Sequence, residues 1–289
     1  MDGVSESAPT IATLRAGDEV DAVFACSRKD RLQARSGTPY LALELRDRTG
    51  AMPGRAFRDA DLLAGRFERG DLVRVVGRVE RFRDELQIDV RAIARAQQAD
   101  PAAFLPVAYR DVDELEGFLE HLAREVHDPG YRGLLERLLA DEALRAEWRR
   151  APCTRAGHHA YLGGLLEHTV AVGTLALEVK QLHPRLNPDL LLCAALLHDI
   201  GKTREFTYGA EIGLSEAGRL VGHVQLGIQL LAEHPLPEDR RLPLVHCILT
   251  HHGPESAPGR RFGSPEALAL YRINALDASV KGALEHGLP

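Results

Sequence analysis

The stretch AALLHDIGKTREF, residues 194–206, places two polar residues, His198 and Asp199, directly after a run of apolar residues. The Asn-Pro pair at 187–188 is a strong helix start, and Gly201 is a typical helix stop. We therefore expect both polar residues in the last turn of a helix. Unpaired carbonyl groups give that end partial negative charge, so a carboxylate there is costly unless a cation binds it. A bound metal ion would remove this cost.

Other histidines of the C-terminal half stand in similar surroundings. LPLVHCILTHHG, residues 242–253, ends an apolar run with His251 and His252, and two more apolar stretches contain His168 and His223. A single histidine in an apolar helix is more often a packed residue, and a histidine pair at a helix end can serve as a cap. The whole set in one helical half favours a metal site. Nitrogen with carboxylate oxygen suits manganese, iron or zinc better than calcium or magnesium.

Composition sets broad limits on the function. The chain has 289 residues, 45% hydrophobic and 27% charged, which is typical of a soluble globular protein with two domains. Its first ten residues, MDGVSESAPT, do not resemble a signal peptide, and no later run is apolar enough to span a membrane. We therefore expect a cytoplasmic protein without a membrane partner. The four cysteines form no CxxC pair, which favours buried, reduced thiols over disulfides or a cysteine-ligated zinc site.

The two halves of the chain differ in hydrophobic period. From residue 13 to residue 94 apolar residues alternate, as in VDAVFAC, YLALEL, DLVRVVGRV and LQIDVRAI, which predicts five short antiparallel strands. Such strands favour a small closed barrel of the oligonucleotide-binding type (OB-fold) over residues 1–95. AQQADPAAFLP begins a linker at 96–112, and everything beyond Asp111 is expected to be helical. The predicted fold class is α+β multidomain, with an all-helical domain at 113–289.

Several motifs of the chain resemble a known family. These are HHAYLGGLLEHT (158–169), LLHDIGKTREF (196–206), GRLVGHVQLG (218–227), ILTHHG (248–253) and FGSPEALAL (262–270). They resemble the HD-domain metal hydrolases, and specifically the YhaM-type 3′-to-5′ exoribonucleases, and the N-terminal half is similar to the oligonucleotide-binding domain of that family. The resemblance covers nearly the whole chain. It implies an all-helical catalytic domain with a divalent metal centre, usually manganese-dependent, that hydrolyses single-stranded RNA and sometimes DNA from the 3′ end. It also implies self-association.

Carried over residue by residue, the resemblance implies a metal centre made of His168, His198, Asp199, His223, His251 and His252. In the family the last helix normally carries an aspartate ligand in a stretch of the form LHxxDxLDA. This chain reads LYRINALDA, with Tyr271 and Asn274 at the usual His and Asp positions, and Asp277 one turn later. An amide brings no charge and binds transition metals more weakly. Three outcomes stay open: weak binding of one metal, recruitment of Asp277 as a ligand, or an impaired centre.

The expected chemistry is phosphodiester hydrolysis at two divalent transition-metal ions. Manganese is the first choice, with iron(II), cobalt(II) and zinc as alternatives. Asp199 is the expected bridging ligand, next to a water that is activated for attack on phosphorus. Lys202 is placed to contact a nonbridging phosphate oxygen, or else is a solvated lysine at a helix end. His158 and His159 are expected to position the substrate or to protonate the leaving group, against a purely structural role.

Single-stranded RNA or DNA is the expected partner, and binding needs aromatic faces and arginines. The expected contacts from the barrel are Tyr40, Arg46 and Arg48. Arg260 and Arg261 are expected to contribute from a Gly/Pro-rich loop, for which an exposed loop without a binding role is the plainer interpretation. Phe57 and Phe82 are also available for stacking on bases, but packing in the barrel core explains these two residues equally well. Residues 1–105 contain 17 Lys and Arg against 17 Asp and Glu, so we expect weak, salt-sensitive binding by the barrel alone.

Two alternative functions remain on the sequence alone. One is an HD phosphohydrolase acting on nucleotides or cyclic dinucleotides, although the GYP signature typical of cyclic-di-GMP hydrolases is absent. The other is a catalytically impaired RNA-binding protein that keeps a metal, and Asn274 is the residue that supports it. The native metal, the choice between RNA, DNA and nucleotides, and the oligomeric state do not follow from the sequence.

Overall fold

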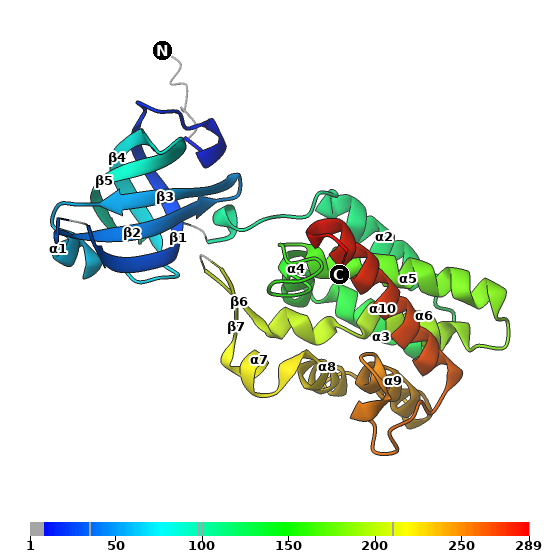
Figure 1. Ribbon diagram of the computed structural model, residues 1–289. Coiled ribbons are helices and arrows are strands. Elements are labelled where there is room, and N and C mark those ends of the chain that lie inside the picture. The colour runs from blue at the N-terminus through cyan, green and yellow to red at the C-terminus, as the bar shows by residue number, and fades with distance from the viewer. Residues whose placement is uncertain (1–8, 35, 98, 100, 210, 289) are drawn as a thin grey trace, which may run out of the picture. The chain divides into compact units, whose positions relative to one another are not determined.

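The computed structural model describes residues 9–34, 36–97, 99, 101–209 and 211–288 (Figure 1). The chain forms two compact units, one made of residues 1–105 with 208–213 and one made of residues 106–207 with 214–289. The expected α+β combination of a small barrel followed by a helical domain is confirmed. The domain boundaries at 95 and 113 stay predictions. The outer boundaries at 1 and 289 lie outside the described residues, as do positions 98 and 100 of the predicted linker.

The first unit is a closed five-stranded barrel with the strand order β1-β2-β3-β5-β4. Neighbouring strands are antiparallel except for β3 and β5, which run parallel. The alternation seen in the sequence turns one face of each strand inward, and Phe24, Leu45 and Ile88 are fully buried in the core. The elements are η1 (Ile11–Thr13), β1 (Glu19–Gln33), β2 (Pro39–Asp47), β3 (Gly50–Ala56), α1 (Ala60–Ala64), β4 (Leu72–Phe82), β5 (Glu85–Arg95) and η2 (Pro101–Phe104).

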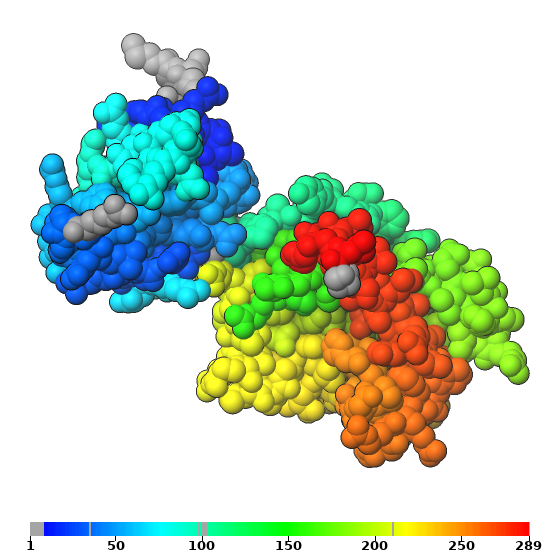
Figure 2. Space-filling view, viewed as in Figure 1, coloured from blue at the N-terminus to red at the C-terminus, as the bar shows by residue number. Residues whose placement is uncertain are grey.

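The second unit is a helical bundle built around α6, whose side chains from Leu190 to Leu197 are all buried. Helices α2, α3, α5, α9 and α10 pack against it. Figure 2 shows that chain segments from the beginning, middle and end of this unit contribute to one face. None of the described helices is long and apolar enough to cross a bilayer. The elements are α2 (Val112–Arg124), α3 (Pro129–Ala140), α4 (Glu142–Arg150), α5 (Gly164–Leu182), α6 (Pro188–Leu197), η3 (Ile200–Arg204), α7 (Glu216–Leu220), α8 (Gly222–Ala232), α9 (Glu238–Thr250), η4 (Pro254–Ser256) and α10 (Pro265–His286).

One short stretch contradicts the expectation that everything beyond Asp111 is helical. Strands β6 (Phe206–Tyr208) and β7 (Ile212–Leu214) form a two-stranded sheet. Aromatic and β-branched residues on both sides of Gly209 favour a hairpin here. Each strand has only three residues, too few for a period of two to show in the sequence.

Helix α6 begins as the sequence predicts, because the side chain of Asn187 accepts a hydrogen bond from the backbone N–H of Leu190. Gly201, however, is not a helix stop. A Cβ atom at this position would come within 2.0 Å of the carbonyl oxygen of His223. The absent side chain therefore lets η3 pack directly on α8, and this close approach brings Asp199 next to His223.

Candidate metal centre

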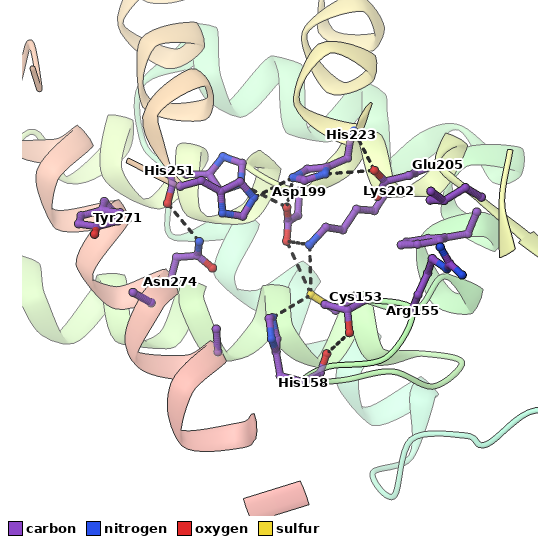
Figure 3. A pocket seen from close by; sticks show the side chains of 16 residues that line it. Cys153, Arg155, His158, Asp199, Lys202, Glu205, His223, His251, Tyr271 and Asn274 are labelled. Carbon is purple, nitrogen blue, oxygen red and sulfur yellow. Dashed lines mark hydrogen bonds and ion pairs between the residues drawn. The ribbon is translucent and has the colours of Figure 1, made fainter. Parts of the chain in front are cut away.

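Four separate segments bring the predicted ligands into one cluster, of which Figure 3 labels Asp199, His223 and His251. His168 lies on α5, His198 and Asp199 follow α6, His223 lies on α8, and His251 and His252 follow α9. We call these six residues the Asp199 cluster. Asp199, its only carboxylate residue, is 2% exposed. The structure thus brings together side chains that are far apart in the sequence. Their role as metal ligands stays a prediction.

One oxygen of Asp199, Oδ1, faces histidines from two helices. It lies 3.3 Å from Nε2 of His223 and 3.4 Å from Nε2 of His251. Nε2 of His252 lies 3.0 Å from Nε2 of His223. One ligand atom from each of these four residues lies within 4.8 Å of the others. The group is compact enough to bind a single metal ion.

The other oxygen, Oδ2, faces a second set of groups. It lies 3.3 Å from Nε2 of His198 and 3.5 Å from Nε2 of His168, and these two nitrogens are 3.1 Å apart. It also accepts a hydrogen bond of 2.6 Å from Nζ of Lys202. Asp199 is therefore shared by two groups of potential ligands, which is the arrangement that a bridging carboxylate requires.

The rings of the cluster are held so that Nε2 points toward Asp199. Nδ1 of His198 donates to the carbonyl oxygen of Ala195 at 2.9 Å, and Nδ1 of His251 donates to that of Ile248 at 2.6 Å. A neutral imidazole whose Nδ1 carries the proton has a lone pair on Nε2. This assignment of protons follows from the hydrogen-bond partners. Both rings therefore offer a free lone pair to the centre.

Two further rings are oriented by carboxylates. Nδ1 of His168 lies 2.6 Å from Oδ2 of Asp277, and Nδ1 of His223 lies 3.3 Å from Oε1 of Glu205. Carboxylates that accept from the far ring nitrogen are typical partners of metal-binding histidines. Asp277 and Glu205 thus fix the direction of Nε2 in both rings.

The residues present fit a divalent transition metal. Among the described residues, Oδ1 of Asp199 and Nε2 of His251 are buried without a hydrogen-bond partner. Such atoms cost free energy unless something pairs with them. The lone pairs of His168 and His198 also meet at 3.1 Å, an arrangement that a cation between them would stabilise. Imidazole nitrogen and carboxylate oxygen are suitable ligands for such an ion.

Burial controls the protonation of the cluster. It lowers the pKa of His168 to about 4 and that of His251 to about 4. Burial together with the neighbouring His251 lowers the pKa of His252 to about 3. Burial alone would raise the pKa of Asp199, but the charge of Lys202 and the imidazoles keep it well below its usual value. At neutral pH His168, His251 and His252 are therefore neutral and the carboxylate of Asp199 is charged, as metal ligands must be.

Lys202 is not a solvated lysine at a helix end. Its side chain is 6% exposed, and Nζ contacts Oδ2 of Asp199 at 2.6 Å and Sγ of Cys153 at 3.3 Å. Burial lowers the pKa of Lys202, but Asp199 raises it more, so the group stays charged. Lys202 lines the pocket that contains the cluster. Its predicted contact with phosphate remains to be tested.

The predicted pair His158 and His159 is divided by the fold. His158 lines the pocket, with Nε2 at 3.7 Å from Sγ of Cys153. His159 is buried, with Nδ1 at 2.8 Å from the hydroxyl of Tyr161 and Nε2 at 3.1 Å from Asp277. Burial lowers the pKa of His159, but the hydrogen bonds of Asp277 and Glu167 raise it more. Because both of its ring nitrogens are engaged, His159 is not placed to contact a substrate as expected.

A buried polar network behind the cluster was not expected from the sequence. The hydroxyl of Tyr161 donates to Glu167 at 2.7 Å, and Nζ of Lys281 contacts the same carboxylate at 3.1 Å. His159 and Asp277 continue the network to His168. Charged residues at 277, 281 and 285, four apart on one helix, are the signal that could have revealed it.

The network predicts a pH-dependent contribution of Glu167 to stability. Burial raises the pKa of Glu167, but His159, Tyr161 and Lys281 lower it to about 2, from an ordinary value of 4.5. A depressed folded-state pKa stabilises the protein above the ordinary pKa, and this stabilisation is lost as the pH falls toward 2. We expect Glu167→Gln to lower the free energy of unfolding above pH 4.5 and to have a shrinking effect below it.

Denaturant unfolding of the metal-free protein at several pH values measures this effect. Glu178→Gln is the control, because Glu178 is exposed on the same helix α5. A difference between wild type and Glu167→Gln that does not change with pH would contradict the expectation.

Asn274 and Asp277 have different surroundings. Asn274 is buried and lines the pocket, and its Nδ2 donates to the carbonyl oxygen of His251 at 3.2 Å. Asp277 contacts His168 and His159 and shares a potential ligand group with them, without Asp199. In this arrangement Asp277 orients His168 from the far side of its ring. Whether it also completes the metal centre stays a prediction.

The expected nucleic-acid contacts of the barrel include a stacked aromatic pair. The rings of Tyr40 and Phe57 are stacked at 5.1 Å, and Arg55 donates to the hydroxyl of Tyr40 at 3.2 Å. Phe57 is 44% exposed and Phe82 is 51% exposed, so the interpretation of both as barrel core is wrong. Phe57 directly follows β3 and Phe82 is the last residue of β4, so both rings lie at strand ends and outside the barrel core.

The four other predicted contacts are exposed arginines. Arg46 and Arg48 lie at the end of β2 and in the turn after it. Arg260 and Arg261 lie in the loop between η4 and α10, and neither is among the described residues that line the pocket of the Asp199 cluster. Their contact with nucleic acid stays a prediction. Arg155, which the sequence analysis did not select, does line that pocket.

Comparison with known proteins identifies both domains. Residues 165–279 match the HD domain, and residues 25–94 match the OB-fold nucleic acid binding domain. The chain is similar to the 3′-5′ exoribonuclease YhaM of Bacillus velezensis, with 27% identity over 277 residues. It is 26% identical over 277 residues to the protein of the same name from Bacillus subtilis. Each alignment covers 91% of this chain and 86% of the relative, and therefore includes both domains.

Proposed function

We propose that this chain, an OB-fold nucleic-acid-binding domain followed by an HD domain, is a metal-dependent hydrolase that degrades single-stranded RNA from the 3′ end. The observation that carries the proposal is the convergence of five histidines on one shared aspartate, which lines a pocket of the HD domain together with His223, His251 and His252. The similarity to exoribonucleases over 91% of the chain supports this substrate class. Single-stranded DNA is a second substrate to test.

The proposal assigns two positions for divalent metal ions. His223, His251 and His252 would hold one ion, and His168 with His198 would hold the other, with Asp199 between them. Manganese is the first metal to test, followed by iron(II), cobalt(II) and zinc. When bound, such ions lower the pKa of a water and neutralise charge on the phosphate oxygens.

The chain itself supplies the groups that hold the phosphate. Lys202 is charged, buried and aimed into the pocket, so its ammonium can neutralise a nonbridging phosphate oxygen without reorganisation. Arg155 offers a guanidinium at the same pocket. Burial and the charge of Lys202 lower the pKa of His158. His158 is therefore neutral at neutral pH, which suits positioning of the substrate better than delivery of a proton to the leaving group.

The size and walls of the pocket suit a terminal nucleotide. Its volume is about 430 Å³, within the range of small-ligand sites. Phe206, Leu214 and Tyr271 add apolar and aromatic surface to a wall that is otherwise rich in histidine. Such surface favours stacking of one unpaired base. A double-stranded end does not expose a base in this way, so we expect paired 3′ ends to be poor substrates.

The barrel would hold the RNA while its end is degraded. The stacked pair of Tyr40 and Phe57, with Arg55 over the Tyr40 ring, offers an aromatic face next to a cation. Tethering of the two domains raises the local concentration of RNA at the pocket. A cytoplasmic location and self-association belong to the same proposal.

We expect Tyr40→Ala to weaken binding of single-stranded RNA by about 10-fold, because stacking on one aromatic ring contributes ~1–3 kcal/mol. The kcat for hydrolysis of a dinucleotide should not change, because it depends on the pocket of the Asp199 cluster and not on the barrel. Fluorescence anisotropy with labelled RNA at two salt concentrations measures the affinity. Tyr109→Ala is the control, because Tyr109 is fully exposed outside the barrel. Equal losses in both variants would contradict the assignment of Tyr40.

A labelled-RNA assay tests the proposed function. Purified protein with manganese should shorten a 5′-labelled single-stranded RNA stepwise from its other end, and chelation should stop the reaction. The double variant His198→Ala/Asp199→Ala should be inactive. Turnover of mononucleotides or cyclic dinucleotides, with RNA left intact, would favour the alternative HD phosphohydrolase. Metal binding without any turnover would favour the impaired RNA-binding protein.

A further inference from the structure

We propose that Cys153 is a ligand of the metal position next to His168, where its thiolate replaces the charge that Asn274 lacks. The inference rests on the metal centre of the proposed function, but it concerns ligation and not the substrate. The sequence favoured reduced thiols without a role in metal binding, so this assignment comes from the fold alone.

The geometry places Cys153 among ligand atoms. One atom each from Cys153, His158 and His168 lies within 4.8 Å of the other two. Sγ of Cys153 lies 3.7 Å from Nε2 of His158 and 3.8 Å from Oδ2 of Asp199. A tetrahedral ion with metal–sulfur and metal–nitrogen distances of ~2.3 and ~2.0 Å separates its ligands by about 3.5 Å. The observed separations are close to this value.

Charge explains why a thiol is useful at this position. Asn274 lines the same pocket with a neutral amide whose nitrogen is engaged with the carbonyl oxygen of His251. The position next to His168 therefore has Asp199 as its shared anion, because Asp277 of α10 contacts the far ring nitrogen of His168 and belongs to a ligand group without Asp199. Coordination of Cys153 replaces its S–H bond by a sulfur–metal bond and releases the proton to solvent. The thiolate then supplies the missing negative charge.

Burial raises the pKa of the Cys153 thiol to about 12, so the thiolate forms only when a metal ion displaces the proton, and a nearby cation can then stabilise it. Nζ of Lys202 lies 3.3 Å from Sγ, and a nearby cation stabilises a thiolate. Figure 3 shows Cys153 between Lys202 and His158, on the wall that faces Asp199. The three other cysteines, Cys26, Cys193 and Cys247, are buried as well, yet none of them belongs to a potential ligand group within the described parts of the chain.

The ligand set makes the two metal positions unequal. A soft sulfur ligand selects zinc, iron(II) or cobalt(II) over manganese. The position formed by His223, His251, His252 and Asp199 has only nitrogen and oxygen ligands. We therefore expect the position with Cys153 to prefer the softer metals.

Cobalt titration of the full-length, metal-stripped protein tests the inference under reducing conditions. Wild type should bind two equivalents and show a near-ultraviolet sulfur-to-cobalt charge-transfer band. Cys153→Ala should lose the band and bind one equivalent fewer. Cys193→Ala, at another buried thiol of the same domain, should keep both. A band that survives in Cys153→Ala, or a wild type that is fully loaded without the band, would overturn the inference.

A measurement on wild type avoids any effect of the substitution on folding. X-ray absorption of the zinc-loaded protein should show a sulfur neighbour at ~2.3 Å from zinc. Nitrogen and oxygen neighbours alone would overturn the inference. The double variant Cys153→Ala/Asn274→Asp should again bind two equivalents of cobalt but without the band. If it binds no more cobalt than Cys153→Ala, the thiolate does not replace the carboxylate.

These results are independent of RNA hydrolysis. A sulfur-ligated centre in a protein that leaves RNA intact would support the inference and contradict the proposed function. RNA hydrolysis by a centre with only nitrogen and oxygen ligands would support the proposed function and contradict the inference.

Discussion

Replacing Asp199 by asparagine is expected to lower RNA hydrolysis by more than ~10³-fold and to remove metal from both positions. The physical reason is that Asp199 is shared by the two ligand groups, one through each oxygen. Asparagine has the same shape but no charge, and it presents an N–H₂ group to one of the two groups. Turnover of labelled RNA and metal content per chain measure the two effects.

The matched control for this prediction is Asp239→Asn, at an exposed carboxylate of the same domain. It should keep both turnover and metal content. An Asp199→Asn variant that still binds two ions, or still hydrolyses RNA at a similar rate, would show that the shared carboxylate does not hold the metals.

Replacing Lys202 by methionine is expected to lower kcat by ~10²–10³-fold while metal still binds. The ammonium is a buried cation in the wall of the pocket, and it competes with metal for Oδ2 of Asp199. We therefore expect metal affinity to rise as RNA turnover falls. Without metal, the unpaired buried carboxylate should destabilise the fold by about 3–5 kcal/mol, and metal should reverse much of this loss.

Turnover of labelled RNA, followed in quenched time points, measures the loss of kcat, and denaturant unfolding measures the loss of stability. Both are carried out with and without metal. Lys281→Met is the control, because Lys281 pairs with Glu167 and is not among the described residues that line the pocket. It should lower stability but leave kcat nearly unchanged. If Lys202→Met keeps its kcat, Lys202 only neutralises Asp199 and does not act on the phosphate.

The sequence predicted the parts of the fold and of the candidate site that follow from local pattern. Alternating apolar residues predicted the barrel, and polar residues at the ends of apolar helices predicted which histidines meet. His198 and Asp199 are the clearest case. The helix that precedes them starts at a recognisable cap, and it ends at Leu197, directly before the two polar residues.

The parts that the sequence did not predict depend on contacts between distant segments. The sequence predicts a helix stop at Gly201, but the role of this glycine is a backbone contact with α8 that only the packed fold reveals. The sequence predicts a substrate contact for His159 beside His158, yet the His159 ring is buried between Tyr161 and Asp277, and Asp277 is distant from it in the sequence. Cys153 and Lys202 are 49 positions apart, so no local pattern connects them.

Anomalous diffraction from crystals soaked with manganese tests the central claim most directly, because it locates bound ions without any assumption about activity. The expected result is an anomalous peak within ligand distance of Oδ1 of Asp199 and Nε2 of His223 and His251, the group in which two buried polar atoms have no hydrogen-bond partner. Manganese bound elsewhere, with no peak beside Asp199, would contradict the assignment of these residues as a metal centre.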